Sequence, residues 1–270
     1  MGISNNCKAL GTQVLLESII KVSYFLVYQK NNMTISIGDP NDDVRKELIA
    51  AHKEVSYGVF QPTPFHVLDD IVNITSLKPG MRIFDFGCGD GLVSRLLAHR
   101  NYHVDGVEED YEVWNWGTLV PSHYSEAFEM VLSEYDSTSN LDEVLHLLQE
   151  IENRVNLNHS DAFTARIDFS VYDVVYLYYP EPVGQKAKEE FDYKLDSLLS
   201  NSKTGIQADG KLLVLRQGSK KPINLPNFVL ESTPMEMLTH SAKAHHLADD
   251  ELRKRGVVDS MTLSIYKVIK

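Results

Sequence analysis

Cysteine is scarce in this sequence of 270 residues, in which only Cys7 and Cys88 are present. They lie most of a domain apart and lack the clustered Cys and His spacing of zinc ligands, which indicates a reducing, cytoplasmic compartment. Glycine and proline number only 15 and 10, so a collagen-like rod and a low-complexity chain are excluded. What is present, 43% hydrophobic and 24% charged residues, is the composition of a globular protein that can bury a full core.

Positive charge and long apolar runs are also in deficit. Lys and Arg number 26 against 38 Asp and Glu, and the formal charge of −12 opposes the counterion release that drives nonspecific binding to nucleic acid. Nucleic acid is therefore a poor candidate partner. Glu17 and Lys21 interrupt the apolar segment 14–27, which falls short of the roughly 18 uncharged residues of a membrane span. We expect an amphipathic helix there, and a protein that stays in the compartment where it is made.

Two segments precede the main domain in the predicted organisation. Residues 8–30 have a helical pattern, and polar, glycine and proline residues mark a boundary over 31–41. Residues 1–32 are either an accessory docking helix or an extension that the domain does not need, and the pattern leaves both open. We assign 33–64 to a linker and covering segment, and 65–270 to one large domain.

Strands and helices alternate along this domain. Strands are predicted over 82–86, 102–107, 154–157, 172–178 and 211–216, and helices over 65–75, 91–100 and 183–200. This alternation predicts an α/β fold with a doubly wound, mostly parallel sheet of seven strands. The last two strands, 228–232 and 262–268, flank a polar helical segment over about 234–255 and are expected to form an antiparallel hairpin at the edge of the sheet.

The stretch 101–153 is strongly acidic, with 13 Asp and Glu residues and no Lys or Arg. It is longer than one crossover helix requires, so we predict a helical insertion over about 120–152, with helices near 123–136 and 140–152. Its charge can steer a basic protein surface toward the molecule, and a solvated helical face is the alternative interpretation. No metal site is predicted, because the histidines late in the chain lack companion Cys or acidic ligands. These are His240, His245 and His246.

A glycine-rich turn is the most informative motif of the chain. Asp85, at the end of an apolar strand, is followed by Gly87, Gly89 and Gly91 at alternate positions, and a helix begins next. Such a turn lets the backbone approach a bound nucleotide closely. The spacing differs from the Gly-x-Gly-x-x-Gly of dinucleotide binding. It resembles the first motif of class I S-adenosylmethionine-dependent methyltransferases, which implies this cofactor and a Rossmann-like fold.

Two further acids follow later strands at matching positions. Glu108 ends the second strand, where a carboxylate can accept hydrogen bonds from both ribose hydroxyls of a nucleoside, and a helix-capping acid is the alternative. Asp161 follows the third strand, at the position where the resemblance implies an acid for the adenine amino group. An ordinary turn aspartate is the alternative there, and Ser160, Ala162 or the local backbone can serve the adenine instead.

The exit of the fourth strand lies where open α/β sheets place their reacting centres, and it reads Tyr178, Tyr179, Pro180 and Glu181. It lacks the Asn or Asp, Pro, Pro, aromatic tetrad of methyltransferases that act on adenine amino groups or glutamine. Those substrates are therefore disfavoured.

A second resemblance is to the seven-strand protein-lysine methyltransferases related to the telomeric-silencing histone methylase. Its motifs are Tyr57-x-x-Phe60-x-Pro62-Thr63-Pro64, Leu77-Lys78-Pro79-Gly80, the Asp85 turn, and Leu177-Tyr178-Tyr179-Pro180. The resemblance implies that the first of these folds over the cofactor, with Thr63 near its methionyl end, and that Tyr178 and Tyr179 line a lysine channel. An aromatic channel favours the neutral amine of a lysine, whose ordinary pKa is about 10.4. Glu181 steers the incoming cation or relays its proton, and core or cap positions are the alternative for all three.

We therefore expect a methyltransferase that uses S-adenosyl-L-methionine and acts on a nitrogen nucleophile, with a protein lysine as the leading acceptor. Small-molecule N- or O-methylation and a non-catalytic, cofactor-binding partner subunit are the alternatives. The expected catalytic residues are Tyr178, Tyr179 and Glu181. The expected cofactor-binding residues are Tyr57, Thr63, Asp85, Gly87, Cys88, Gly89, Gly91, Glu108, Asp161 and Tyr178.

Overall fold

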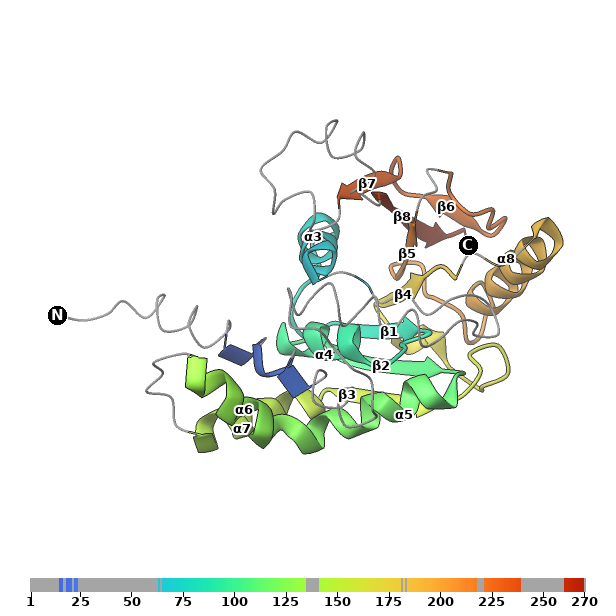
Figure 1. Cartoon of the computed structure of the whole chain (residues 1–270). Coiled ribbons are helices and arrows are strands. Elements are labelled where there is room, and N and C mark those ends of the chain that lie inside the picture. Colours follow the sequence, from blue (N-terminus) through green and yellow to red (C-terminus); the bar gives the residue numbers. More distant parts are fainter. Residues whose placement is uncertain are drawn as a thin grey trace.

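The fold is an α/β arrangement around one eight-stranded sheet (Figure 1). It is seen in a computed structural model that describes residues 15–16, 18–20, 22–23, 63, 65–134, 141–180, 182, 184–217, 221–238 and 260–269. The strands are β1 (Arg82–Phe86), β2 (His103–Glu108), β3 (Val155–His159), β4 (Val174–Tyr178), β5 (Lys211–Gln217), β6 (Phe228–Leu230), β7 (Met235–Leu238) and β8 (Ser260–Val268). Their order is β3-β2-β1-β4-β5-β8-β6, with β7 also paired to β8.

The first five strands are parallel, and the last three pair antiparallel. Central strands β1 and β4 are largely buried on both faces, because helices cover the parallel sheet from both sides. Successive residues of β4 contribute to two separate core clusters, with Val174 and Tyr176 in one and Val175 and Leu177 in the other. The predicted doubly wound, mostly parallel sheet with an antiparallel edge is therefore confirmed.

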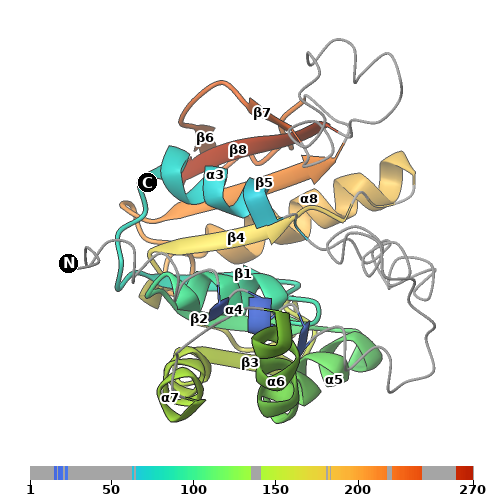
Figure 2. The same cartoon turned by 60° about the vertical axis from the view of Figure 1, so that its left-hand side comes forward.

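Helices pack on both faces of the sheet (Figure 2). The helices are α3 (Phe65–Thr75), α4 (Leu92–His99), α5 (Tyr111–Leu119), α6 (Tyr124–Glu134), α7 (Leu141–Glu152) and α8 (Gln185–Leu199), with short 3-10 turns η1 (Val120–His123) and η2 (Phe169–Val171). Apolar residues of α3, α4, α6 and α7 join the first cluster, whereas α8 buries Phe191, Leu195 and Leu199 in the second. This one-sided spacing of apolar residues is what makes each segment an amphipathic helix.

The C-terminal edge differs in one element from the sequence prediction. The predicted strands near 228 and 262–268 pair antiparallel as β6 and β8, but β7 (Met235–Leu238) replaces the start of the predicted helix at 234–255. Met235 and Met237 alternate with polar Glu236, which is the period-two pattern of a strand. β6 and β7 both pair with β8, and the bend between them contains Pro234, which cannot donate to a ladder.

Helices α5, η1, α6 and α7 lie between β2 and β3. The insertion predicted over about 120–152 corresponds to η1, α6 and α7, and α6 and α7 lie close to the two predicted helices. The described residues of 15–23 are helical, and Leu15, Leu16, Ile19 and Ile20 are buried in the same cluster as α4, α6 and α7. No helix in the described ranges has the length and apolar character needed to cross a bilayer. The boundary at 31–41 and the late histidines lie outside the described residues.

Candidate functional site

The candidate site lies at the carboxyl ends of β1 to β4, where the order of the sheet reverses between β1 and β4. Ligands of doubly wound folds bind outside the carboxyl ends of the strands at such a switch point. Asp85 of β1 pairs with Gly106 of β2 on one side and with Tyr176 of β4 on the other. The glycine-rich turn therefore begins directly at the switch point.

The turn over 87–91 is built from three glycines in the left-handed region, with φ of 75°, 59° and 77° at Gly87, Gly89 and Gly91. Only glycine adopts this conformation without strain. The amide of Cys88 donates to the carbonyl of Val107 at 2.9 Å, which ties the turn to β2. A Cβ placed on the exposed Gly87 meets no atom within 4 Å. The backbone at Gly87 is therefore open to a ligand.

Glu108 joins the end of β2 to the same turn. One carboxylate oxygen accepts the amide of Gly89 at 2.9 Å, and the other accepts the amide of Asp110 at 2.8 Å. Burial raises the pKa of Glu108, and these amides oppose the shift. Asp110, not Glu108, caps α5 by accepting from the amides of Glu112 and Val113. A carboxylate has about four acceptor positions, so Glu108 retains capacity for ligand hydroxyls.

Asp85 is buried at 2% exposure, and one of its carboxylate oxygens accepts from the Ser94 hydroxyl at 2.7 Å. The pKa of Asp85 is raised to about 7, and burial is the main cause. The nearby carboxylates of Glu108 and Asp90 add to the rise, while the Ser94 hydrogen bond opposes it. A positively charged ligand group beside Asp85 would favour its ionised form. The electrostatics of this site therefore suit a cation and disfavour a phosphate.

The exit of β3 reaches the same edge of the sheet. The amide of Ser160 donates to the carbonyl of Glu108 at 2.9 Å, which places Asp161 beside the end of β2. One oxygen of Asp161 accepts the amide of Phe163 at 2.8 Å, the geometry of an ordinary turn aspartate. Asp161 thus has a local structural role at the position where the adenine contact was predicted.

The two tyrosines at the exit of β4 do not lie together. Tyr178 is half-buried against the first core cluster, whereas Tyr179 is fully buried in the second. The Tyr179 hydroxyl donates to Asp192 of α8 at 2.6 Å, and the Arg216 guanidinium lies 5.0 Å from its ring centroid. Neighbouring residues of an extended chain point to opposite faces, so Tyr179 occupies the core position that was the alternative. Glu181 lies outside the described residues.

Thr63 is buried on the same face as Asp85. Its hydroxyl shares a 2.5 Å hydrogen bond with the hydroxyl of Tyr176, the residue that pairs with Asp85 across the switch point. Tyr176 is not among the predicted site residues, although its alternation with Tyr178 along β4 was the available signal. Tyr57 lies outside the described residues. The structure thus brings Thr63, Asp85, the glycine turn, Glu108 and Asp161 to one edge, with Tyr178 at the end of β4.

The chain matches no protein-family model and no curated protein in sequence. Solved structures are similar to it in fold. An RNA methyltransferase from Salinibacter ruber, in complex with S-adenosyl-L-homocysteine, is 14% identical, with 77% of this chain and 94% of that chain covered and a TM-score of 0.42. YcgJ from Bacillus subtilis is 11% identical over 76% and 99% of the two chains, with a TM-score of 0.42. The cyclase SpnF is 12% identical over 80% and 88%, with a TM-score of 0.45. Similarity at this level concerns the fold alone, and the chemistry of the site rests on the residues described above.

Proposed function

We propose that the protein is a class I methyltransferase that uses S-adenosyl-L-methionine. The observation that carries the proposal is a pair of carboxylates, the buried Asp85 and the half-buried Glu108, on either side of an open glycine turn at the switch point of the sheet. A dinucleotide or nucleoside triphosphate would bring phosphate charge against these carboxylates. A nucleoside that carries cationic groups and free ribose hydroxyls suits them.

The residues of the chain have separate tasks in this proposal. Glu108 accepts the ribose hydroxyls, while its bond to Gly89 keeps the turn in place. Asp85 balances the positive charge of the ligand, and the turn backbone at Gly87 and Cys88 lies against the ligand. Asp161 or its neighbours contact the adenine, and Thr63 with Tyr57 covers the methionyl end. The cofactor supplies a methyl group already activated on a sulfonium, so alignment and exclusion of water are what the protein adds.

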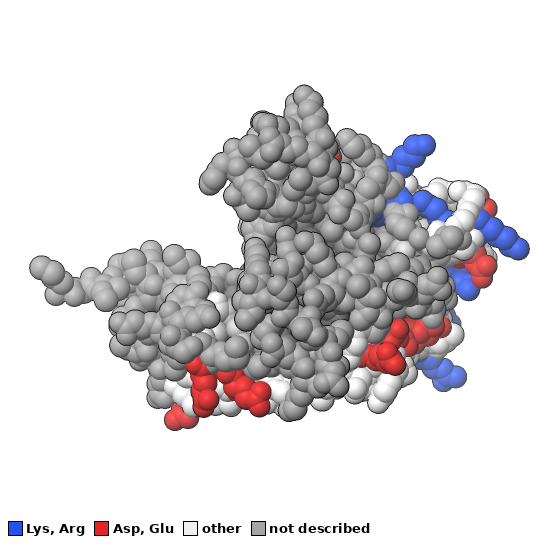
Figure 3. Space-filling model, viewed as in Figure 1, with Lys and Arg blue, Asp and Glu red and all other residues white. Residues whose placement is uncertain are grey.

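For the acceptor, we propose a nitrogen nucleophile, with a protein lysine leading. The acidic insertion supports this choice, because Asp and Glu side chains gather over α5 to α7 along the lower margin of the molecule (Figure 3). A basic protein segment is attracted to such a surface. The amine must lose its proton before transfer, and the half-buried Tyr178 is the described aromatic placed to line its approach. Tyr179 lies in the core of the opposite face, and the Tyr179→Phe variant described below tests whether its hydroxyl contributes. Glu181, which follows this strand exit in the sequence, is proposed to guide the incoming cation.

The test is transfer of tritiated methyl from S-adenosylmethionine into lysate, separated into protein, nucleic acid and low-mass pools. Asp85→Asn is the loss variant, and Glu109→Gln, an exposed acid beside Glu108, is the matched control. Protein label that yields methyllysine and disappears only with Asp85→Asn supports the proposal. Label confined to the low-mass pool replaces lysine with a metabolite.

Two other outcomes bear on the cofactor site. Label that survives Asp85→Asn removes the assigned site. A protein that binds the cofactor but labels nothing until a second protein is added is a partner subunit, and a protein that neither labels nor binds overturns the proposed function.

A further inference from the structure

A buried arginine on α4 joins the glycine turn to the inserted helices. Arg95 is 3% exposed, and its Nε and Nη2 donate to the two carboxylate oxygens of Glu152, the last residue of α7, at 2.7 and 3.2 Å. The same guanidinium donates to the carbonyl of Asp90 in the turn at 3.3 Å and to that of Gly117 in α5 at 2.9 Å. One side chain therefore connects α4, the turn, α5 and α7.

Helix α5 also contacts the turn directly. A Cβ on Gly117 would lie 2.1 Å from the carbonyl oxygen of Asp90, so α5 approaches this closely only because residue 117 is glycine. The Asp90 peptide is held between α5 and the Arg95 guanidinium. The neighbouring amide of Gly89 is held by Glu108. The turn is therefore fixed from the insertion side as well as from β2.

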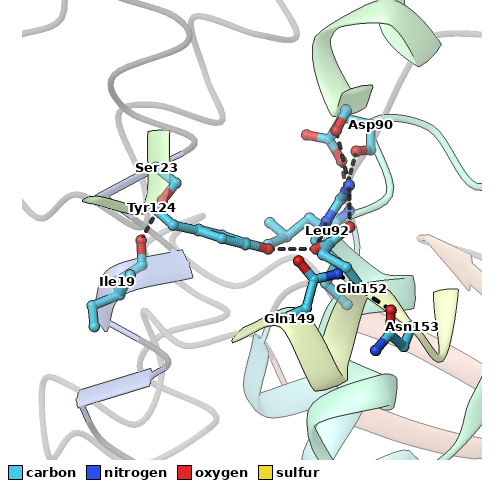
Figure 4. A network of polar contacts seen from close by, with 10 residues as sticks. Ile19, Ser23, Asp90, Leu92, Tyr124, Gln149, Glu152 and Asn153 are labelled. Carbon is cyan, nitrogen blue, oxygen red and sulfur yellow. Dashed lines mark hydrogen bonds and ion pairs between the residues drawn. The ribbon is translucent and has the colours of Figure 1, made fainter. Parts of the chain in front are cut away.

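Helix α6 holds the acidic partner of the arginine. The Tyr124 hydroxyl donates to Glu152, and Figure 4 shows these two side chains directed toward each other near Asp90. Burial raises the pKa of Tyr124 well above its usual value, so the phenol remains a donor at neutral pH. A two-pronged guanidinium–carboxylate pair fixes direction as well as distance, which a lysine ammonium does not.

We propose that the Arg95–Glu152 pair, with its contacts to Asp90 and Gly117, is a brace that sets the shape of the glycine turn. The inserted helices thereby control cofactor affinity from outside the site, and Arg95 is a positioning residue. The inference rests on the proposed function for the identity of the ligand. The ordering of the turn is a property of the free protein and is measured without ligand.

Hydrogen exchange over 86–92 in the free protein reports the turn, because four of its amides are hydrogen-bonded. These are the amides of Cys88, Gly89, Gly91 and Leu92. Arg95→Lys keeps the charge and loses the fork, and Glu152→Gln keeps the volume and loses the carboxylate. Both variants should exchange faster over this segment. Glu150→Gln, also on α7, breaks the more exposed 3.8 Å pair with Arg154 in the turn after the helix, and it should exchange like the wild type.

Binding is followed in the same variants with S-adenosylhomocysteine. Both tryptophans of the chain, Trp114 and Trp116, lie on α5, the helix that Arg95 contacts through Gly117. A change in their fluorescence therefore measures ligand binding close to the brace. We expect Kd to rise about tenfold in Arg95→Lys and in Glu152→Gln, and KM for S-adenosylmethionine to rise with it. The kcat at saturation should stay within about twofold, a split that general destabilisation does not produce.

Unchanged exchange in both brace variants overturns the inference, and so does faster exchange with an unchanged Kd. If Arg95→Lys does not fold, the isosteric Glu152→Gln alone decides. If the wild type does not bind S-adenosylhomocysteine, the proposed function fails. In that case faster exchange in the variants supports the brace as the element that orders the turn, and unchanged exchange rejects it.

Discussion

Two buried aspartates, Asp85 on β1 and Asp192 on α8, lie on opposite faces of the sheet and are held in different ways. Asp192 is 8% exposed, and burial raises its pKa. Its surroundings oppose that shift, because the Tyr179 hydroxyl donates to it and the cations of Lys188 and Arg216 favour its charge. The fold itself thus offsets part of the cost of burying the Asp192 carboxylate, and its contact with Tyr179 makes Asp192 a structural acid that anchors α8.

Asp85 has no comparable compensation among the described residues. The Ser94 hydroxyl donates to it, while the charged groups that act on it, Glu108 and Asp90, are carboxylates. A buried acid whose charge the fold leaves costly is typical of a functional site. The difference between the two aspartates distinguishes the ligand-binding face of this sheet from its structural face.

Asp85→Asn should give the largest effect, as a gain in stability at neutral and alkaline pH. The pKa of Asp85 rises from 3.8 in the unfolded chain to about 7 in the fold. Below pH 3.8 the group is neutral in both states, and stability then falls as pH rises toward 7, where the full penalty of about 4 kcal/mol is reached. Urea unfolding at pH 4 and pH 8 measures this. An equal effect of the variant at both pH values would contradict the shift.

Asp192→Asn should act in the same direction as Asp85→Asn but more weakly. Burial raises the pKa of Asp192, so its charge also costs stability at pH 8, while the Tyr179 hydroxyl and the cations of Lys188 and Arg216 offset part of that cost. The same unfolding experiment measures the difference. A gain as large as that of Asp85→Asn would mean that Asp192 and Asp85 are the same kind of site.

Glu108→Gln should weaken binding of S-adenosylhomocysteine about 100-fold, equivalent to about 2.7 kcal/mol. Glutamine offers one oxygen and one NH₂ group where the amides of Gly89 and Asp110 both need an acceptor, so the turn loses a support along with the ribose contact. Calorimetric titration gives the Kd, and exposed Glu109→Gln is the control. A change below threefold would remove Glu108 from the site.

Features that depend on the main chain were predictable from the sequence. The turn at Gly87, Gly89 and Gly91 follows from a conformation that only glycine adopts freely, and the place of Glu108 follows from the parallel register of β1 and β2. The alternation of apolar strands and amphipathic helices determined the parallel sheet. Helix α3 was predicted with its observed bounds for the same reason.

Features that depend on side chains meeting across long stretches of sequence were not predictable. Arg95 and Glu152 are 57 residues apart, and nothing local to either indicates the other. Tyr179 was predicted to line the lysine channel because the sequence indicates that it follows the fourth strand, but not which face of the sheet its side chain joins. The start of β7 was assigned to the polar helical segment predicted over about 234–255, whereas its four residues pair with β8 across a loop that the local pattern does not indicate.

Tyr179→Phe should cost about 1 kcal/mol of stability and leave methyl transfer unchanged. The variant removes the hydrogen bond to Asp192 while the ring keeps its packing on Phe191, 5.3 Å between centroids. Thermal unfolding and the methyl-transfer assay are run on the same preparation. Loss of transfer with unchanged cofactor affinity would give the Tyr179 hydroxyl a catalytic role. The face of the sheet that carries Asp192 would then take part in catalysis as well.

Asp161→Asn should have the smallest effect and refine the ligand-binding side of the comparison. Asparagine retains an oxygen for the amide of Phe163, so the turn and the stability should stay within about 0.5 kcal/mol of the wild type. If Asp161 accepts the adenine amino group, Kd for S-adenosylhomocysteine should rise a few-fold, and less for an analogue that lacks this amino group. Equal losses for the two ligands would assign the adenine contact to Ser160 or the backbone instead, and Asp161 would then be a structural acid on the ligand-binding face.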